Sequence, residues 1–543
     1  MPRAFAAVAL LALASLLIRS ARMELAGDTL DPIGSVRAQD EALYASTAIH
    51  MALQGSWLTP EFMGRMALYK PPLLIWAAAL SARLAGISRL ALRFPVALLS
   101  ALAAGLIFWW AAEMRSWQAG ACSVLLLASN HLWHVLCGMC LTDGLLAAFY
   151  TAAMYCLFSD PWLESPPAFW GFVAAVAAAI LTKSVAGLLP VAVLGLYFLL
   201  APRQYRPRFL RILAAGIAIL ALAAPWFVYQ LIVHHRWFWT EHVAVEILGY
   251  GGGAPPQTSQ ENQVLFYLMR ILRLDPVLVA LAAVSLPAFA ADLKRRSAPA
   301  VLLGCWMAVL MAALFFWQYR NVTYLLPLIP AAAILASAYG TLGEVRSAKW
   351  LAVVATAALL LKLATPVAPW GISFEGGTII ATAPMLSSYC ERGRGNELIL
   401  VEPQDELFAS VLPLPKARYF LIGGMPATGP YGMDFASMGI VLTAAQFNDL
   451  APWMPSFRKH LREWGLTKTD AVGTMIIAAT PAELADTIAA HPDADFFLPD
   501  RYRGAVTDAA AQAHDVISAP PGRIFLLARR SAPAPPPRWR CNP

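Results

Sequence analysis

The sequence contains few charged residues for its length. Only 13% of its 543 residues are Asp, Glu, Lys or Arg, whereas about a quarter are charged in soluble globular proteins. The hydrophobic share is 59% and the mean hydropathy is +0.59. So little charge over such a length excludes an ordinary soluble protein and indicates that a lipid bilayer surrounds much of the chain.

The sequence also lacks a concentrated basic patch. Its formal net charge is +7, but the Lys and Arg residues are dispersed, mainly among short loops between apolar runs. Nucleic-acid-binding proteins gather these residues on one face, so we expect no nucleic-acid partner. The sequence shows no internal repeat of the kind that transporters often contain.

The apolar residues form runs of the length that crosses a bilayer, which takes about 20 residues. The run Ala4–Ile18 has no small-x-small cleavage site directly after it, so we predict an uncleaved first helix. Further runs occupy residues 93–112, 117–136, 144–158, 168–182, 185–200, 209–233, 264–290, 300–317, 322–340 and 349–366. We therefore predict an all-α polytopic membrane domain over residues 1–366, with about 11–13 transmembrane helices.

Clusters of basic residues between the runs set the orientation, because cytoplasmic loops are enriched in Lys and Arg. Arg203–Arg211, Lys294–Arg296 and Arg346–Lys349 mark the inner side. The predicted outer segments are then residues 19–92, residues 234–263, the turn around Arg320, and everything after about residue 367.

The short run Leu73–Ala82 decides which side Asp143 occupies. If this run lies along the interface, Asp143 is on the outer side; if the run crosses, Asp143 is cytoplasmic. The run is too short to cross, so we predict an interfacial helix and an outer Asp143. This choice leaves Arg83, Arg89 and Arg93 outside, against the charge rule.

Residues 367–532 differ from the rest because charge and proline become denser. Their β-like and helical runs predict a soluble α/β domain, followed by a disordered Pro- and Arg-rich tail at 533–543. If this part lies outside the cytoplasm, Cys390 and Cys541 could form a disulfide. The β-like runs are Leu398–Val401, Tyr419–Ile422, Met475–Ala478 and Ile524–Leu527, and the clearest helical run is Pro481–Ala490.

Side chains suited to chemistry gather in the first outer loop. Residues 38–53 read as a helix with Gly55 as its C-cap, and this helix carries the adjacent carboxylates Asp40 and Glu41. Adjacent carboxylates shift each other's pKa and can act in acid–base chemistry. The simpler interpretation of the pair is a solvated helix face.

Short motifs follow one another in an order that resembles one enzyme superfamily. The outer loop contains Asp40–Ala45 (Asp-Glu-Ala-x-Tyr-Ala), Gly55–Pro60 and Lys70–Leu73. The later motifs are Thr142–Leu146, Leu181–Ser184 (close to Leu-Thr-Lys-Gly), Ala224–Trp226, Trp239–His242 and Thr323–Pro327. The ordered set resembles the GT-C glycosyltransferases, in the branch of the bacterial lipid A aminoarabinose transferases (ArnT) and the protein O-mannosyltransferases.

The resemblance implies a GT-C fold and an inverting glycosyltransferase of a bacterial inner membrane. Its donor would be a sugar carried on a polyprenyl (undecaprenyl) phosphate. Its acceptor would be an envelope glycolipid such as lipid A or, by the same chemistry, a protein. The α/β domain would be periplasmic, and the enzyme would act as a monomer among membrane lipids.

The resemblance also implies catalytic carboxylates. An acceptor hydroxyl needs a general base, a role for Asp40 or Asp143, with Glu41 beside the first of these. An acceptor phosphate needs no base, and the carboxylates would then orient the sugar hydroxyls.

The remaining predicted residues bind substrate. The leaving polyprenyl phosphate needs positive charge, for which Lys70 and Lys183 are the main candidates and Arg320 is the third. Membrane-boundary lysines can instead extend towards the headgroups. The predicted substrate-binding set also contains Tyr44, Tyr324, Glu241 and His242.

The sequence leaves any cofactor unidentified. The aminoarabinose transferases carry a Glu before the Lys-Pro, which looks like a metal-binding pair with the histidine of their Glu-His motif. Here that position is Tyr69, so His242 loses its partner, which weakens the case for a divalent metal ion without excluding one. A second set of possible metal ligands is spaced three residues apart: His131, His134, Cys137 and Cys140. Each step of three residues rotates the side chain by about 60° around a helix, so the four do not converge on one ion. This spacing favours packing between helices over metal binding.

Two other classes of function suit a membrane protein with a soluble domain. A lipid or sugar transporter (flippase) often has repeat halves and helices broken at the membrane midplane, and the sequence indicates neither. A membrane-anchored assembly protein would depend on residues 370–543. The Gly- and Pro-rich segment Gly251–Pro256 would form a lid in a glycosyltransferase and a flexible connector otherwise.

Overall fold

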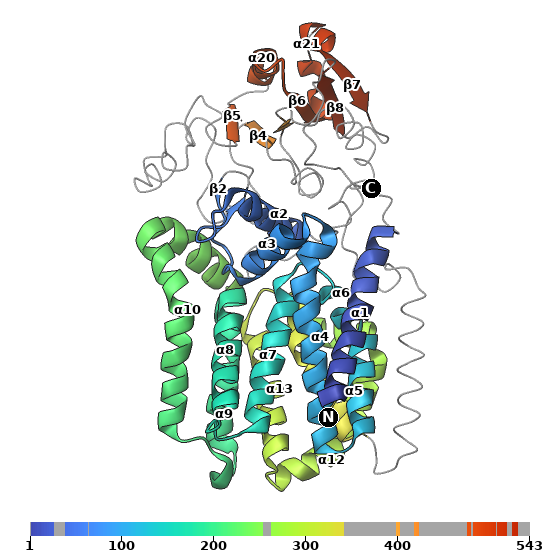
Figure 1. Cartoon of the computed structure of the whole chain (residues 1–543), viewed down its shortest axis with the longest axis vertical. Helices are drawn as coiled ribbons and strands as arrows, with labels where there is room; N and C mark the ends of the chain where they lie inside the picture. The colour runs from blue at the N-terminus through green and yellow to red at the C-terminus, as the bar shows by residue number, and fades with distance from the viewer. Residues whose placement is uncertain are drawn as a thin grey trace.

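The computed structural model describes two groups of residues. The first comprises residues 2–25, 39–62, 65–252 and 262–340. The second comprises residues 398–401, 417–422, 475–478, 482–506, 508–518 and 524–529. Figure 1 shows the first group as a bundle of upright helices, with the strands of the second group beyond one end of it.

The upright helices are apolar and long. In the described ranges, five helical stretches are long and apolar enough to cross a membrane: Leu90–Met114, Pro166–Leu200, Arg203–His235, Pro276–Lys294 and Ala298–Phe316. The bundle contains α1 (Pro2–Leu25), α4 (Arg89–Met114), α5 (Trp117–Ser129), α7 (Thr142–Ser159), α8 (Pro166–Lys183), α9 (Leu189–Leu200), α10 (Phe209–Phe238), α12 (Pro276–Lys294), α13 (Ala298–Phe316) and α14 (Ile329–Ala338). The predicted run 349–366 lies outside the described residues.

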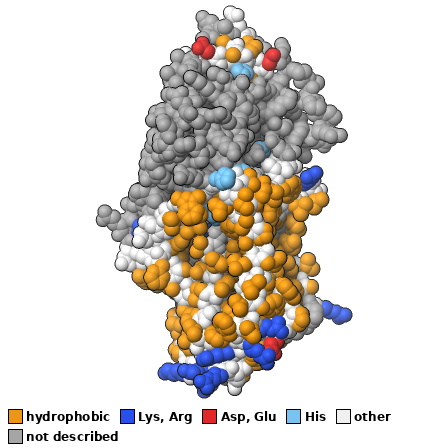
Figure 2. Space-filling model, turned by 90° about the vertical axis from the view of Figure 1, so that its left-hand side faces the viewer, with side chains coloured by type: hydrophobic (Ala, Val, Ile, Leu, Met, Phe, Trp, Pro, Cys, Tyr) orange, Lys and Arg blue, Asp and Glu red, His pale blue; other side chains and the backbone are white. Residues whose placement is uncertain are grey.

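The surface of the bundle has the pattern of a membrane protein. Large apolar side chains such as Leu213, Ile217 and Leu220 are exposed along α10. Figure 2 shows apolar side chains covering the flank and Lys and Arg gathered at one end. An apolar belt of this size is stable only in lipid, and the basic end matches the inner loops expected from the sequence. The protein is therefore a multi-pass membrane protein.

Two predicted runs are each divided in the structure. The run 264–290 was expected to be continuous, but it forms α11 (Gln263–Leu274) and α12, with Asp275 between them. Asp275 precedes a proline, which disfavours helical backbone, and its carboxylate accepts from the backbone N–H of Leu278 at 3.0 Å as a helix cap. The run 117–136 breaks at Asn130, which caps α6 (His131–Leu136) by accepting from Trp133 N–H.

The first outer loop forms the helices expected from its sequence. The helix predicted at 38–53 is α2 (Gln39–Gln54), and Gly55 follows it with its N–H bonded to the Met51 carbonyl. The short run Leu73–Ala82 lies in α3 (Leu73–Ala85). Its 13 residues span about 20 Å, less than the roughly 30 Å of bilayer hydrocarbon. Both helices lie over the end of the bundle opposite the basic loops (Figure 1).

The second group of described residues forms a mixed six-stranded sheet. Its order is β5-β4-β3-β6-β8-β7, in which the pairs among β5, β4, β3 and β6 are parallel and the last two are antiparallel. Strands occur in all four β-like runs. The elements are β3 (Leu398–Val401), β4 (Ala417–Ile422), β5 (Met475–Ala478), α20 (Ala482–Ala490), β6 (Asp495–Pro499), α21 (Asp508–Ala513), β7 (His514–Ser518) and β8 (Ile524–Arg529). The boundaries 367–532, the tail 533–543 and the Cys390–Cys541 disulfide remain predictions that extend outside the described residues.

Candidate active site

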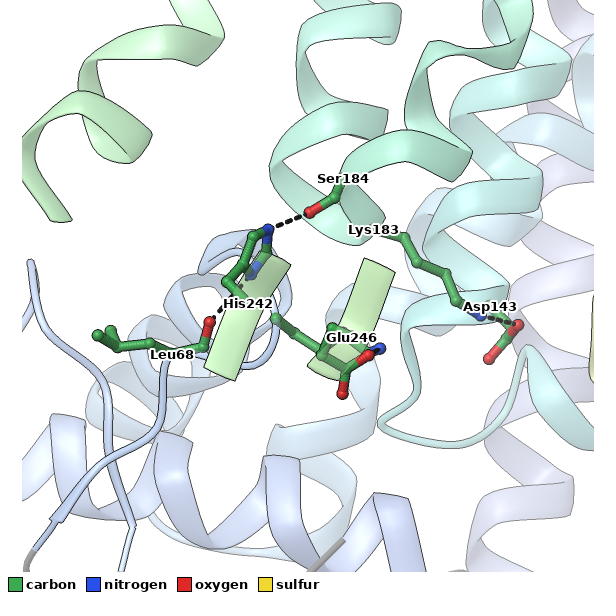
Figure 3. Close-up of polar contacts among 7 residues, drawn as sticks. Leu68, Asp143, Lys183, Ser184, His242 and Glu246 are labelled. Atoms are coloured by element: carbon green, nitrogen blue, oxygen red, sulfur yellow. Dashed lines mark hydrogen bonds and ion pairs between the residues drawn. The ribbon is translucent and has the colours of Figure 1, made fainter. Parts of the chain in front are cut away.

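Asp143 and Lys183 meet at the end of the bundle that lies opposite the basic loops. Asp143 is in the first turn of α7, where the partial positive charge of the helix N-terminus favours a carboxylate. Lys183 is the last residue of α8, and its Nζ lies 2.6 Å from Asp143 Oδ1 (Figure 3). Their side chains are 11% and 14% exposed, so the ion pair is largely but not fully desolvated.

Two glycines allow close packing around the segments that carry this pair. A Cβ on Gly144 would lie 2.6 Å from Val96 Cγ1, so its absence lets α7 pack against α4. After Lys183 the chain turns back through the 3₁₀ helix η1 (Ser184–Leu188). A Cβ on Gly187 would lie 2.3 Å from the backbone of Ala179, so this turn requires glycine.

Tyr324 joins the pair from a distant part of the chain. It lies in the 3₁₀ helix η4 (Val322–Leu328), and the Nζ of Lys183 is 4.7 Å from the centre of its ring. A lysine at this distance from an aromatic face is stabilised by a cation–π interaction. The charges of both Asp143 and Glu246 also act on the Tyr324 phenol, so both acidic residues lie near this ring.

Lys70 forms a second ion pair at the same end. Its Nζ contacts Oε2 of Glu246, which is carried by the π-helix η3 (Trp239–Gly249). The side chains are 21% and 9% exposed. The site thus contains two lysines and two carboxylates, with each lysine bound to one carboxylate.

Residues on η3 also hold the backbone directly before Lys70. The Leu68 N–H donates to Glu241 Oε2 at 2.9 Å, and the Leu68 carbonyl lies 3.0 Å from Nδ1 of His242. The other ring nitrogen of His242, Nε2, lies 2.6 Å from the Ser184 hydroxyl (Figure 3). One imidazole therefore connects the segment of Lys70 with the segment of Lys183.

The contacts of His242 define its tautomer. Burial lowers the pKa of His242 to about 4, so the ring is neutral near pH 7. A carbonyl can only accept, so Nδ1 carries the proton and donates to Leu68. Nε2 then accepts a hydrogen bond from the Ser184 hydroxyl.

Glu41 is fully buried in an ion pair with Arg93. Its two oxygens accept from Nε and Nη2 of Arg93 at 2.7 and 3.0 Å. The same carboxylate accepts from the backbone N–H of Cys140 at 2.7 Å, three residues before Asp143. Glu41 therefore contacts the scaffold of the site, which favours positioning over the catalytic role expected from the sequence. This pairing also explains why Arg93 departs from the charge rule, since a paired and buried arginine is not a loop charge.

The other predicted residues have separate environments. Asp40 belongs to α2, but its side chain is outside the described part of the structure. Tyr44 is buried and stacks on Tyr69 with ring centres 6.0 Å apart. The guanidinium of Arg320 lies 5.6 Å from the Phe266 ring. The contacts that define the two ion pairs involve neither Tyr44 nor Arg320.

Glu246 and Ser184 were not among the residues chosen from the sequence. Glu246 lies outside the motifs, and its only signal is an acidic residue in a largely apolar segment. Ser184 stands in the Leu-Thr-Lys motif, where its hydroxyl differs from the glycine of the resembled family. Neither contact can be derived from sequence spacing, because Lys70 and Glu246 are 176 residues apart and Ser184 and His242 are 58 apart.

The donor set does not fit a divalent metal ion. Both nitrogens of His242 are engaged by groups of the chain, and Tyr69 is a buried aromatic where the resembled enzymes have Glu. Across the described residues, no three His, Cys, Asp or Glu side chains cluster as metal ligands. This holds for His131, His134, Cys137 and Cys140 as well.

Comparison with known proteins identifies similar sequences. The family model described as dolichyl-phosphate-mannose-protein mannosyltransferase matches residues 69–229. The undecaprenyl phosphate-alpha-4-amino-4-deoxy-L-arabinose arabinosyl transferase of Aeromonas hydrophila is 30% identical over 223 residues, which is 38% of this chain and 39% of the relative. The corresponding transferase 2 of Proteus mirabilis is 27% identical over 319 residues, 55% of each protein. The chain thus spans about half the length, or less, of these curated relatives.

The solved structures extend the similarity to nearly the whole chain. ArnT from Cupriavidus metallidurans bound to undecaprenyl phosphate aligns with a TM-score of 0.62, covering 96% of this chain and 97% of that one at 18% identity. This chain has the ArnT fold. The apo form of ArnT aligns with a TM-score of 0.59 at 18% identity. The resemblance to the aminoarabinose transferases and mannosyltransferases that the motifs indicated is confirmed.

Proposed function

We propose that the protein is a glycosyltransferase that moves a sugar from polyprenyl phosphate, of the undecaprenyl class, to an envelope acceptor such as lipid A. The observation that carries this proposal is the cluster of Lys70, Lys183, Tyr324 and two carboxylates at the end of an apolar bundle. An amphipathic donor of this kind keeps its chain in lipid and its phosphate at the interface, which is where this cluster lies. The name and bound lipid of the similar ArnT structure support the same donor class.

The two lysines supply the charge that a phosphate leaving group needs. The acceptor oxygen attacks the anomeric carbon, and the bond from that carbon to the phosphate oxygen breaks with inversion. The polyprenyl phosphate leaves with the bonding electrons, and its negative charge is stabilised by the ammonium groups of Lys70 and Lys183. Tyr324 contacts Lys183 and can donate its phenol proton to a phosphate oxygen.

The carboxylates serve the sugar and the acceptor. Asp143, or Asp40 on α2, accepts the proton of an acceptor hydroxyl; with a phosphate acceptor they hold the sugar hydroxyls instead. Before the donor binds, Lys70 is paired with the carboxylate of Glu246. When the donor binds, its phosphate replaces this carboxylate as the partner of Lys70. Glu41 and Glu241 position the segments that carry Asp143 and Lys70.

The setting of the enzyme follows from the same proposal. The bundle lies in a bacterial inner membrane with about 11–13 transmembrane helices. The site and the C-terminal α/β domain are periplasmic, and the enzyme acts as a monomer. The similarity to protein mannosyltransferases supports a protein hydroxyl as the alternative acceptor, reached by the same chemistry.

Binding of undecaprenyl phosphate tests the donor site directly. Titration of the purified protein in nanodiscs should give saturable binding, and Lys70→Met and Lys183→Met should each weaken it about tenfold to 100-fold, as expected for loss of a charged hydrogen bond. The matched control is Lys294→Met, an exposed lysine at the basic end, which should bind as the wild type does. Equal affinity in all four proteins would contradict the proposed site.

A further inference from the structure

Two residues that differ from the resembled enzymes lie beside the same imidazole. Ser184 stands where their Leu-Thr-Lys-Gly motif has glycine, and Tyr69 stands where they carry Glu. In this chain Ser184 donates to Nε2 of His242, and the carbonyl of Leu68, the residue before Tyr69, accepts from Nδ1 of the same ring. The two differences are thus one local feature.

Ser184 has a strained backbone conformation, which makes the contact of its hydroxyl important. Its φ is 43° and its ψ is −117°, a conformation that glycine adopts freely and other residues adopt only under strain. A serine here costs more than a glycine unless its side chain forms a compensating contact. The hydrogen bond of 2.6 Å to His242 is that contact.

We propose that the Ser184 hydroxyl takes the place of a metal ion on His242, so that a metal-free hydrogen-bond bridge positions Lys70 relative to Lys183. Ser184 and His242 are therefore positioning residues. The bridge itself is independent of the reaction, whereas its catalytic consequence rests on the proposed glycosyl transfer.

The connectivity of the bridge supports this role. His242 and its neighbour Glu241 hold both polar backbone groups of Leu68, two residues before Lys70. Ser184 directly follows Lys183 in the sequence. Movement of the imidazole would therefore shift the two lysines relative to each other. Partners of this kind orient catalytic groups, and their loss typically costs about 10- to 100-fold in metal sites.

The groups that contact the imidazole also disfavour a cation at this position. A dication on Nε2 would have to displace the Ser184 hydroxyl. At the position of the family Glu, Tyr69 offers a phenol, which is a poorer ligand for such an ion than a carboxylate.

Metal content tests the bridge without requiring turnover. The purified protein is incubated with Zn²⁺ or Mn²⁺, dialysed, and analysed by plasma mass spectrometry beside His242→Gln. We expect both proteins to hold the same background level, below about a tenth of an equivalent. One equivalent in the wild type that His242→Gln loses would overturn the proposal.

Donor kinetics test the positioning role. Ser184→Ala keeps the strained backbone and loses the hydroxyl, whereas Ser184→Gly loses both. Both should raise the KM for the polyprenyl-phosphate sugar about tenfold with a much smaller change in kcat, and Ser184→Gly should not restore it. An unchanged KM in Ser184→Ala would overturn the positioning role. Absence of transfer by the wild type would instead refute the proposed function and leave the metal result standing.

Discussion

Asp143→Asn is expected to lower the rate of glycosyl transfer by about 100-fold or more, the usual contribution of a general base or of a charge acting on the transition state. Asparagine has nearly the same shape, but it cannot accept a proton and carries no charge. It also leaves Lys183 without the partner that now lies 2.6 Å away. The change therefore affects both the acceptor side and the phosphate side of the site.

The measurement is the initial rate of release of free polyprenyl phosphate at saturating donor. Asp292→Asn is the matched control, because Asp292 lies on α12 close to the basic end, and we expect it to retain the wild-type rate. Thermal unfolding of Asp143→Asn, measured beside the rate, separates a loss of chemistry from a loss of folding. If Asp143→Asn retains the wild-type rate, Asp143 is not part of the active site.

Glu41→Ala is expected to destabilise the protein by about 3–5 kcal/mol, the usual cost of removing one partner from a buried ion pair. Arg93 is 1% exposed, and its two bonds to Glu41 would have no replacement from water. The backbone N–H of Cys140 would lose its acceptor as well. Because this N–H lies three residues before Asp143, activity should fall together with stability.

Reversible unfolding in mixed micelles measures this effect. The double variant Glu41→Leu with Arg93→Met is the informative control, since it replaces the ion pair by apolar side chains of similar volume. It should recover much of the lost stability, as apolar replacements of buried ion pairs often do. If Glu41→Ala alone unfolds as the wild type does, the ion pair is not a structural link between α2 and α4.

The sequence predicts the bundle well because bilayer thickness imposes a length on apolar runs. It also places Asp143 with the first outer loop, since Leu73–Ala82 is too short to cross. It does not predict the breaks at Asn130 and Asp275, where a single polar cap interrupts an otherwise apolar run. Such caps depend on tertiary packing: Asn130 Nδ2 donates to Asp275 Oδ2 at 2.9 Å across 145 residues of sequence.

The same distinction applies to the site. The motifs identify Lys70, Lys183, Asp143 and His242 as residues of interest, because rare charges beside apolar runs are informative. They do not identify the partners, since the contacts join segments separated by many helices. Glu41 illustrates the difference: adjacency to Asp40 predicts acid–base chemistry, whereas the fold turns its carboxylate towards Arg93 and Cys140.

Glycosyl transfer is tested most directly by the release of free polyprenyl phosphate from total bacterial lipid that contains polyprenyl-phosphate sugars. The purified protein in detergent is incubated with this extract, and the product is quantified by mass spectrometry beside heat-denatured protein. We expect time-dependent release by the native protein alone, with the sugar recovered on an acceptor. No release above the denatured control, with lipids from several bacterial envelopes, would contradict glycosyl transfer and favour a transport or assembly role.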